Sequence, residues 1–135
     1  MIILSLNARG LGGASKKNSL KRLITNINPT VLLIQEITME GKTVEEAINE
    51  CAKDWKMQSI NTEGNSRGIL TAWIPMMNMI STTRYGLVLG TLMEDKETRL
   101  SYTILNIYGN LYDRKMFWEF VGNSGALEQT NVIMG

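Results

Sequence analysis

The sequence predicts a mixed α/β fold in which helices come early and antiparallel hairpins follow. Three observations carry this prediction. Apolar residues recur with helical spacing in two early segments, short apolar runs are bounded by glycine, proline or asparagine, and the second half alternates strand-like runs with turn-rich connections. Apolar residues make up 44% of the chain, which suits a single domain over residues 1–135.

The first expected strand, Met1–Asn7, is apolar and leads into a loop that contains three glycines. A helix is expected over residues 15–27, with Ser15 as its N-cap and Pro29 just beyond its end. Apolar residues at i, i+3, i+4 and i+7 predict one buried stripe on this helix: Leu20, Leu23, Ile24 and Ile27.

The next expected strand is the short apolar run Val31–Gln35, a pattern typical of a strand buried on both faces. Glu36 follows at its C-terminal end. Thr43 and Glu46 have the spacing of a capping box for a second helix. The buried stripe expected there is Val44, Ile48, Cys51 and Trp55. This spacing favours a buried core thiol for Cys51 over a reactive one.

The second half of the chain is expected to be rich in strands, with a charged hairpin connection at residues 94–97 and a short helix capped by Asp113. This order suggests a sheet covered by helices on one face. The expected strands are Lys56–Asn61, Ile69–Ile74, Arg84–Met93, Arg99–Tyr108 and Asn131–Met134.

Composition excludes several function classes. The chain has no histidine, so this chain alone cannot use imidazole as base, nucleophile or metal ligand. It has neither a run of 18 apolar residues nor the features of a signal peptide, so an intracellular protein without a membrane partner is expected.

Charge is distributed unevenly. Residues 1–35 contain no acid, and their basic residues are candidate contacts for a phosphate backbone. Composition alone favours a second interpretation for the four that fall in the first helix, namely a solvated helix face. The basic residues are Arg9, Lys16, Lys17, Lys21 and Arg22.

Three polar residues share one kind of position. Asn7, Glu36 and Tyr108 each lie at the C-terminal end of an apolar strand, where α/β folds place their functional loops. A carboxylate, an amide and a phenol at one sheet edge supply a hard oxygen ligand for Mg²⁺ or Mn²⁺ and two hydrogen-bonding groups for a phosphate. Each residue taken singly is more often a turn or surface residue.

Four segments carry a family resemblance. They look like motifs of the endonuclease domain of plant LINE-type (non-LTR) retrotransposons, in the endonuclease/exonuclease/phosphatase superfamily. They occur in the order and spacing of that family, and the resemblance covers essentially all of the chain. The segments are Ile3–Gly13, Leu33–Glu36, Gly68–Trp73 and Leu105–Gly109.

The resemblance implies a four-layered α/β sandwich related to deoxyribonuclease I, which cleaves a DNA phosphodiester with Mg²⁺ or Mn²⁺. It makes Glu36 the metal ligand. Asn7 is implied to orient the catalytic carboxylate region and the phosphate, and Tyr108 to hydrogen-bond the scissile phosphate. DNA is the implied partner, a reverse transcriptase is a possible companion in the parent element, and the location is nuclear if the retroelement origin holds.

Two family motifs are absent. In the family, a strand like Asn131–Gly135 leads into a Gly-Asp-x-Asn motif, and an Asp-His or Ser-Asp-His end comes later; this sequence has neither. The chain is therefore expected to be the N-terminal part of a longer domain, with the C-terminal half missing, and inactive by itself. Two alternatives stay open: a non-catalytic nucleic-acid-binding or assembly module, and a phosphatase or sphingomyelinase-like member of the superfamily. The oligomeric state is left open.

Overall fold

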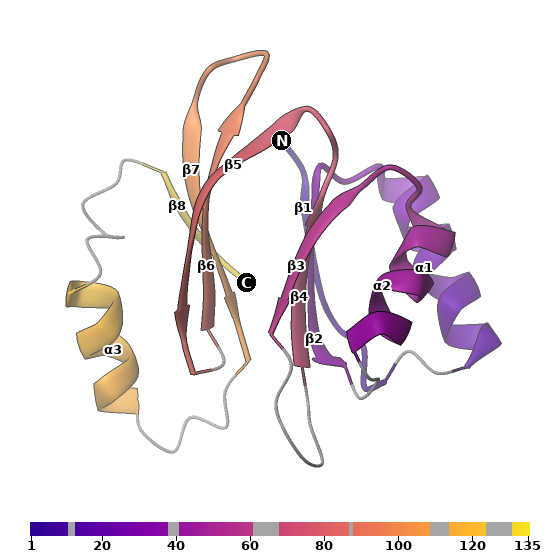
Figure 1. The fold of residues 1–135 in the computed structure, drawn as a ribbon, viewed down its shortest axis with the longest axis horizontal. Coiled ribbons are helices and arrows are strands. Elements are labelled where there is room, and N and C mark those ends of the chain that lie inside the picture. The colour runs from indigo at the N-terminus through magenta and orange to yellow at the C-terminus, as the bar shows by residue number, and fades with distance from the viewer. Residues whose placement is uncertain (11–12, 38–40, 61–67, 87, 109–113, 124–130) are drawn as a thin grey trace. The chain divides into compact units, whose positions relative to one another are not determined.

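The computed structural model describes residues 1–10, 13–37, 41–60, 68–86, 88–108, 114–123 and 131–135. By its internal contacts the chain divides into two compact units, Met1–Pro75 and Met76–Gly135. Each unit is built on a four-stranded mixed sheet (Figure 1). The mixed α/β prediction is confirmed, although it envisaged a single sheet; one domain over residues 1–135 stays a prediction.

The sheet of the first unit has the order β1-β2-β4-β3. Strands β1 and β2 are parallel neighbours, and β4 pairs antiparallel with both β2 and β3. Because β2 and β4 are central and are buried at every residue except Glu36, they carry the apolar runs that the sequence shows. The strand bounds are β1 Ile3–Asn7, β2 Val31–Ile37, β3 Lys56–Ile60 and β4 Gly68–Trp73.

Helices α1 (Ala14–Ile27) and α2 (Gly41–Cys51) lie side by side against one face of this sheet (Figure 1). Leu20 of α1 and Ile48 of α2 share a core with alternate residues of the central strands. Residues two apart on a strand face the same side, so one sheet face makes this core. The sheet residues buried in it are Leu32, Ile34, Ile37, Leu70 and Ala72.

Both predicted helix caps are wrong. Helix α1 begins at Ala14 with Gly13 in the N-cap position and without a side-chain cap, so Ser15 already lies within the helix. Helix α2 begins at Gly41, which places Thr43 inside its first turn. Caps at Ser15 and Thr43 predict helices that begin at Lys16 and Val44, whereas the helices begin at Ala14 and Gly41.

The predicted buried stripes are confirmed in part. Leu20 is buried, and Ile24 and Ile27 are half-buried, but Leu23 is 40% exposed. The stripe is narrower than expected because only the part of α1 nearest the sheet meets it. In the second stripe, Ile48 is buried, and Cys51 and Trp55 pack against the same core. Trp55 lies beyond the end of α2, and the side chain of Val44 is outside the described set.

The second unit contains a sheet of order β5-β6-β7-β8. Strands β5, β6 and β7 form an antiparallel meander, and β8 pairs parallel with β7. The unit also contains helix α3, Arg114–Asn123; its predicted cap, Asp113, lies outside the described residues. The strand bounds are β5 Met77–Tyr85, β6 Val88–Asp95, β7 Ser101–Ile107 and β8 Val132–Met134.

The predicted strand Arg84–Met93 is wrong, because it spans two strands. Strand β5 ends at Tyr85, Gly86 takes a left-handed backbone (φ 54°), and β6 begins at Val88. A glycine at positive φ allows the chain to reverse here. Most of β5, Met77–Thr83, lies outside the predicted strands, because the consecutive polar residues Ser81–Arg84 break the apolar pattern.

The charged hairpin connection between β6 and β7 is confirmed. Asp95 ends β6, and its side-chain Oδ1 accepts hydrogen bonds from the backbone N–H groups of Glu97 at 2.8 Å and Thr98 at 3.2 Å. Arg99 follows with positive φ and forms an ion pair with Glu94 at 3.3 Å. The Asp95 side chain therefore shapes the turn that joins β6 and β7.

Candidate functional site

Asn7 and Glu36 lie at the same edge of the first sheet. Asn7 is the last residue of β1 and lies opposite Gln35 in the parallel register with β2; Glu36 is the next residue of β2. Asn7 is exposed and Glu36 is half-buried. The predicted adjacency of these two strand ends is confirmed, whereas the chemical roles of the two residues stay predictions.

Glu36 occupies a bulge in β2. The register between β2 and β4 shifts between Ile34 and Ile37, and Glu36 has a left-handed backbone with φ 57°. A non-glycine residue in this region costs about 1–2 kcal/mol, because Cβ crowds the following carbonyl oxygen. Such strain clusters at functional sites and turns the residue out of the regular strand alternation. The predicted strand ended at Gln35, and the bulge extends it to Ile37.

The loop after β1 also contains residues with a left-handed backbone, as Glu36 does. Arg9 (φ 44°) and Gly10 (φ 89°) are both left-handed. Ala8 donates its backbone N–H to the Gln35 carbonyl, and Gly10 donates to the Glu36 carbonyl, each at 2.9 Å. Backbone hydrogen bonds therefore continue past the end of β1, and they connect the Arg9 loop to the bulge at Glu36.

Two side chains hold Arg9 in this conformation. The Asn7 Oδ1 accepts the Arg9 backbone N–H at 3.1 Å, and the Lys16 Nζ donates to the Arg9 carbonyl at 2.6 Å. Lys16 comes from the first turn of α1, so the helix is linked directly to the loop. The amide oxygen of Asn7 has this internal partner, and its amide nitrogen carries two donors for a ligand.

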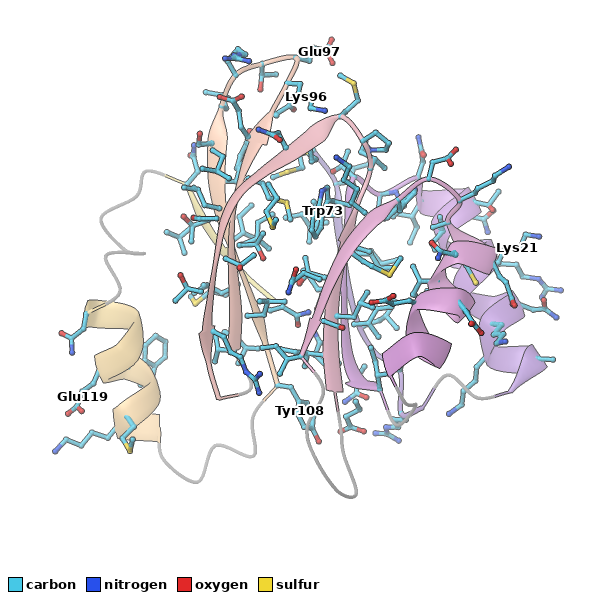
Figure 2. All side chains as sticks on the ribbon, in the orientation of Figure 1. Lys21, Trp73, Lys96, Glu97, Tyr108 and Glu119 are labelled. Carbon is cyan, nitrogen blue, oxygen red and sulfur yellow. The ribbon has the colours of Figure 1, made fainter. Side chains whose placement is uncertain are left out.

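The five predicted basic residues separate into distinct environments. Arg9 and Lys16 belong to the loop beside Glu36. Lys17 pairs with Glu50 of α2 at 3.4 Å. Lys21 and Arg22 are exposed on the outer side of α1, where Figure 2 shows Lys21 pointing away from the sheet. They line a shallow hollow with three uncharged polar residues of the same helix: Asn18, Thr25 and Asn26.

Cys51 behaves as a core thiol. Its Sγ is half-buried and donates weakly to the Lys17 carbonyl at 3.6 Å. Burial, and then the nearby Glu50 carboxylate, raise the pKa of the Cys51 thiol. A raised pKa leaves less thiolate at neutral pH, which fits a structural residue and not a nucleophile.

Tyr108 belongs to the second unit. It follows the last residue of β7 directly and is half-buried (Figure 2). Asn106 of the same motif is fully buried in β7. The predicted position of Tyr108 at a strand end is confirmed. Because Asn7 and Glu36 are described in the first unit, the meeting of all three residues stays a prediction.

Sequence reasoning missed two residues that lie near the Asn7 end of β1. Ser19 and Leu23 of α1 line a hollow of about 170 Å³ together with Asn7 and Lys16. Leu23 fits the apolar stripe of the helix, so the sequence pattern predicts that it is buried and gives no sign of its exposure. Ser19 falls in a polar stretch without a motif, and only the folded neighbourhood distinguishes it.

A divalent metal ion is the cofactor that the resemblance implies. The side chains near Glu36 can be compared with the ligands that such an ion prefers. Within the described residues, His, Cys, Asp and Glu do not gather in a group of three or more. The described residues therefore do not by themselves form an all-protein cage. Mg²⁺ is often held by one or two carboxylates together with water and substrate phosphate, so a single carboxylate at Glu36 fits that ion in kind.

The sequence matches neither a protein-family profile nor a curated protein. Solved structures do match. The endonuclease/exonuclease/phosphatase family protein from Bacteroides thetaiotaomicron superposes with a TM-score of 0.65 at 9% identity, over 91% of this chain and 58% of that one. The endonuclease domain of TRAS1, a telomere-specific non-LTR retrotransposon, gives 0.59 at 12% identity, over 98% and 58%. D. rerio TDP2 complexed with single strand DNA product gives 0.63 at 12% identity, over 98% and 57%.

These likenesses establish the fold. The chain has the α/β fold of the endonuclease/exonuclease/phosphatase proteins, so the predicted deoxyribonuclease I-like fold class is confirmed. The chain spans between 43% and 61% of the length of the solved chains that it resembles. In the described part of the chain, no helix has the length and apolar character needed to cross a membrane.

Proposed function

We propose that Asn7, Glu36 and Tyr108 are parts of a metal-dependent phosphodiesterase site that acts on DNA, of the kind found in LINE-type retroelement endonucleases of plants. The observation that carries the proposal is the strained bulge at Glu36. Glu36 is a carboxylate residue at a β-bulge and holds a left-handed backbone, and backbone strain of this kind clusters at functional sites. Nuclease function in proteins of this fold, and the four sequence motifs, support the same assignment.

In the proposed site each residue has a separate task. Glu36 holds Mg²⁺ or Mn²⁺ through a hard carboxylate oxygen. When bound, such an ion stabilises the charge that develops on a phosphate oxygen. The amide N–H groups of Asn7 donate to the phosphate, and the phenol of Tyr108 donates to the scissile group, which fixes the geometry of the substrate.

The proposal also concerns what this chain lacks. One carboxylate ligand and no histidine leave the attacking water without an evident base in the sequence. We therefore propose that the 135-residue chain binds metal and DNA weakly and that cleavage needs groups that the resemblance places after a strand like Asn131–Gly135.

A second candidate function is a non-catalytic nucleic-acid-binding module. The observation in its favour is the N-terminal charge distribution, since residues 1–35 carry five cations and no acid. Phosphate contacts of this kind bind DNA without any metal. The two functions differ in one measurable property, because only the metal site couples DNA affinity to a divalent ion through Glu36.

The experiment is a Mn²⁺ titration of the chain, followed by electron paramagnetic resonance, with and without a short DNA duplex. We expect binding in the millimolar range, typical of sparse oxygen sites, and tighter binding when DNA supplies phosphate ligands. Glu36→Gln should weaken the Mn²⁺ affinity by at least about tenfold. The matched control is Glu97→Gln, which removes an exposed carboxylate from the β6–β7 turn.

Micromolar Mn²⁺ binding that survives Glu36→Gln would exclude Glu36 as the ligand. If DNA binds equally well with and without Mn²⁺, and Glu36→Gln changes neither affinity, the binding-module function replaces the phosphodiesterase function.

A further inference from the structure

The peptide unit between Arg9 and Gly10 forms a hydrogen bond at each of its two ends. Its carbonyl oxygen accepts the Lys16 Nζ at 2.6 Å, and its N–H donates to the Glu36 carbonyl at 2.9 Å. A peptide unit is planar and its C=O and N–H point in opposite directions, so a group that fixes the carbonyl also fixes the N–H. Lys16 therefore acts on the same peptide that contacts the backbone of Glu36.

The backbone of Glu36 depends on support from this side. The pairing of β2 with β4 passes from Ile34 to Ile37, so the regular ladder skips Glu36. A left-handed residue other than glycine persists only where the surrounding structure holds it, and Glu36 has φ 57°. The hydrogen bond from Gly10 supplies such a hold from the loop that follows β1.

Lys16 strengthens this hold in two ways. Arg9 has φ 44°, a strained conformation of its own, and the ammonium group restrains the Arg9 carbonyl in it. A cation bonded to the carbonyl also polarises the peptide, which makes its N–H a stronger donor. The restraint is anchored outside the loop, because Lys16 belongs to α1, and α1 packs against the first sheet.

We infer that Lys16 is a positioning residue for Glu36. Through the Arg9–Gly10 peptide it holds the Glu36 backbone in the conformation in which the carboxylate binds a metal ion. The inference rests on the proposed function, in which Glu36 is the ligand.

The sign of one effect separates positioning from simple charge. A lysine near a bound cation repels that cation. Charge alone therefore predicts that loss of Lys16 strengthens metal binding or leaves it unchanged, whereas positioning predicts weaker binding.

The test uses the whole 135-residue chain and two readouts: hydrogen exchange of the Gly10 amide, followed by NMR without metal, and Mn²⁺ affinity, followed by electron paramagnetic resonance. Lys16→Met keeps a carbon stem and removes the donor. We expect it to speed exchange at Gly10 and to weaken Mn²⁺ binding, each by about twofold to tenfold, the usual contribution of one hydrogen bond. Lys16→Arg should restore most of both, because it keeps a cationic donor.

The controls are Lys17→Met and the amide of Ala8. Lys17 is paired with Glu50, so its replacement removes the same charge one residue away and should leave Gly10 exchange unchanged. Ala8 donates to the Gln35 carbonyl from a different peptide, so its exchange should change less than that of Gly10. Circular dichroism spectra check that each variant is folded.

Unchanged exchange at Gly10 in Lys16→Met would overturn the inference, and so would Mn²⁺ binding that stays the same or tightens. An equal effect of Lys17→Met would also overturn it, since the result would then be one of general charge. Glu36→Gln distinguishes a failure here from a failure of the proposed function. If Glu36→Gln leaves Mn²⁺ binding intact, the proposed function falls and this inference falls with it. If Glu36→Gln weakens the binding and Lys16→Met does not, the inference alone falls.

Discussion

Gly10 donates its backbone N–H to the carbonyl of Glu36 at 2.9 Å, and this bond joins two left-handed stretches of chain. On one side of it, Asn7 and Lys16 hold the Arg9 loop. On the other side, the bulge in β2 turns Glu36 out of strand alternation. The position of the candidate metal ligand therefore depends on a loop that is fixed by two polar side chains from separate elements.

Core stability should depend strongly on α2 and weakly on the exposed side of α1. Ile48→Ala removes a fully buried side chain from the core and should destabilise the fold by about 2–5 kcal/mol. Leu23→Ala is the comparison on the neighbouring helix; it should cost about 1 kcal/mol or less, because Leu23 is 40% exposed and alanine favours helix. Urea unfolding curves measure both. Equal losses would mean that Leu23 belongs to the core after all.

Much of the first unit could be predicted because its central strands β2 and β4 are buried and its strand β1 is mostly apolar. The runs that lead to Asn7 and Gln35 are mostly apolar, so both β1 and β2, and the meeting of Asn7 with Glu36 at one edge, follow from the pattern. The bulge could not be predicted. Glutamate gives no signal for positive φ, and the left-handed turn arises from the pairing of Ile37 with Gly68 of β4, a contact distant in sequence.

In the second unit the prediction from sequence failed at two places, the edge strand β5 and the turn between β5 and β6. Strand β5 lies at the edge of its sheet. Its residues Ser81–Arg84 are all polar, so a prediction based on apolar runs does not find it. Gly86 turns the chain inside a run that looks continuous from Arg84 to Met93. Neighbouring strands supply the backbone hydrogen bonds that override weak local preference at such places.

The β6–β7 turn should become less stable in acid. Backbone N–H groups of Glu97 and Thr98 donate to the Asp95 carboxylate and lower its pKa from the ordinary value of 3.8. A lowered folded-state pKa gives stability that is present above 3.8 and is lost as the pH falls through the folded value. The parent chain should therefore be more stable than Asp95→Asn near neutral pH, and the two should converge in acid.

The measurement is chemical unfolding of both chains at about pH 7 and at about pH 2, on either side of the titration. Glu97→Gln serves as a control for loss of negative charge, because Glu97 contributes its backbone and not its side chain to this turn. A difference between the parent and Asp95→Asn that persists or grows in acid contradicts the proposed cause.

DNA binding should be weak and salt-sensitive, with unequal contributions from the cations of α1. Each phosphate contact contributes about 0.9 to the slope of log K against log salt on duplex DNA. Lys21→Gln combined with Arg22→Gln should therefore lower the slope by up to about 1.8, since both residues are exposed on the outer side of the helix. Lys17→Gln should lower it less, because Lys17 is paired with Glu50.

Anisotropy titrations of a labelled duplex at several salt concentrations give these slopes. Glu50→Gln provides the reverse control, since it releases Lys17 and should raise the affinity slightly. If the double variant binds as tightly as the parent at every salt concentration, the basic residues of α1 form only a solvated helix face.

The 135-residue chain should not cleave DNA above background when Mg²⁺ or Mn²⁺ is supplied. Hydrolysis needs a positioned metal ion, a base for the attacking water and groups that stabilise the transition state. The chain offers one candidate ligand, Glu36, and the candidate phosphate contacts Asn7 and Tyr108, but it has no histidine. General acid–base assistance alone contributes about 10²–10⁴ in rate, and groups that act as a unit lose most of their effect when any is absent. A supercoiled-plasmid nicking assay that compares the parent with Glu36→Ala decides the matter: metal-dependent nicking by the parent, lost in the variant, would mean that these residues already form a complete site.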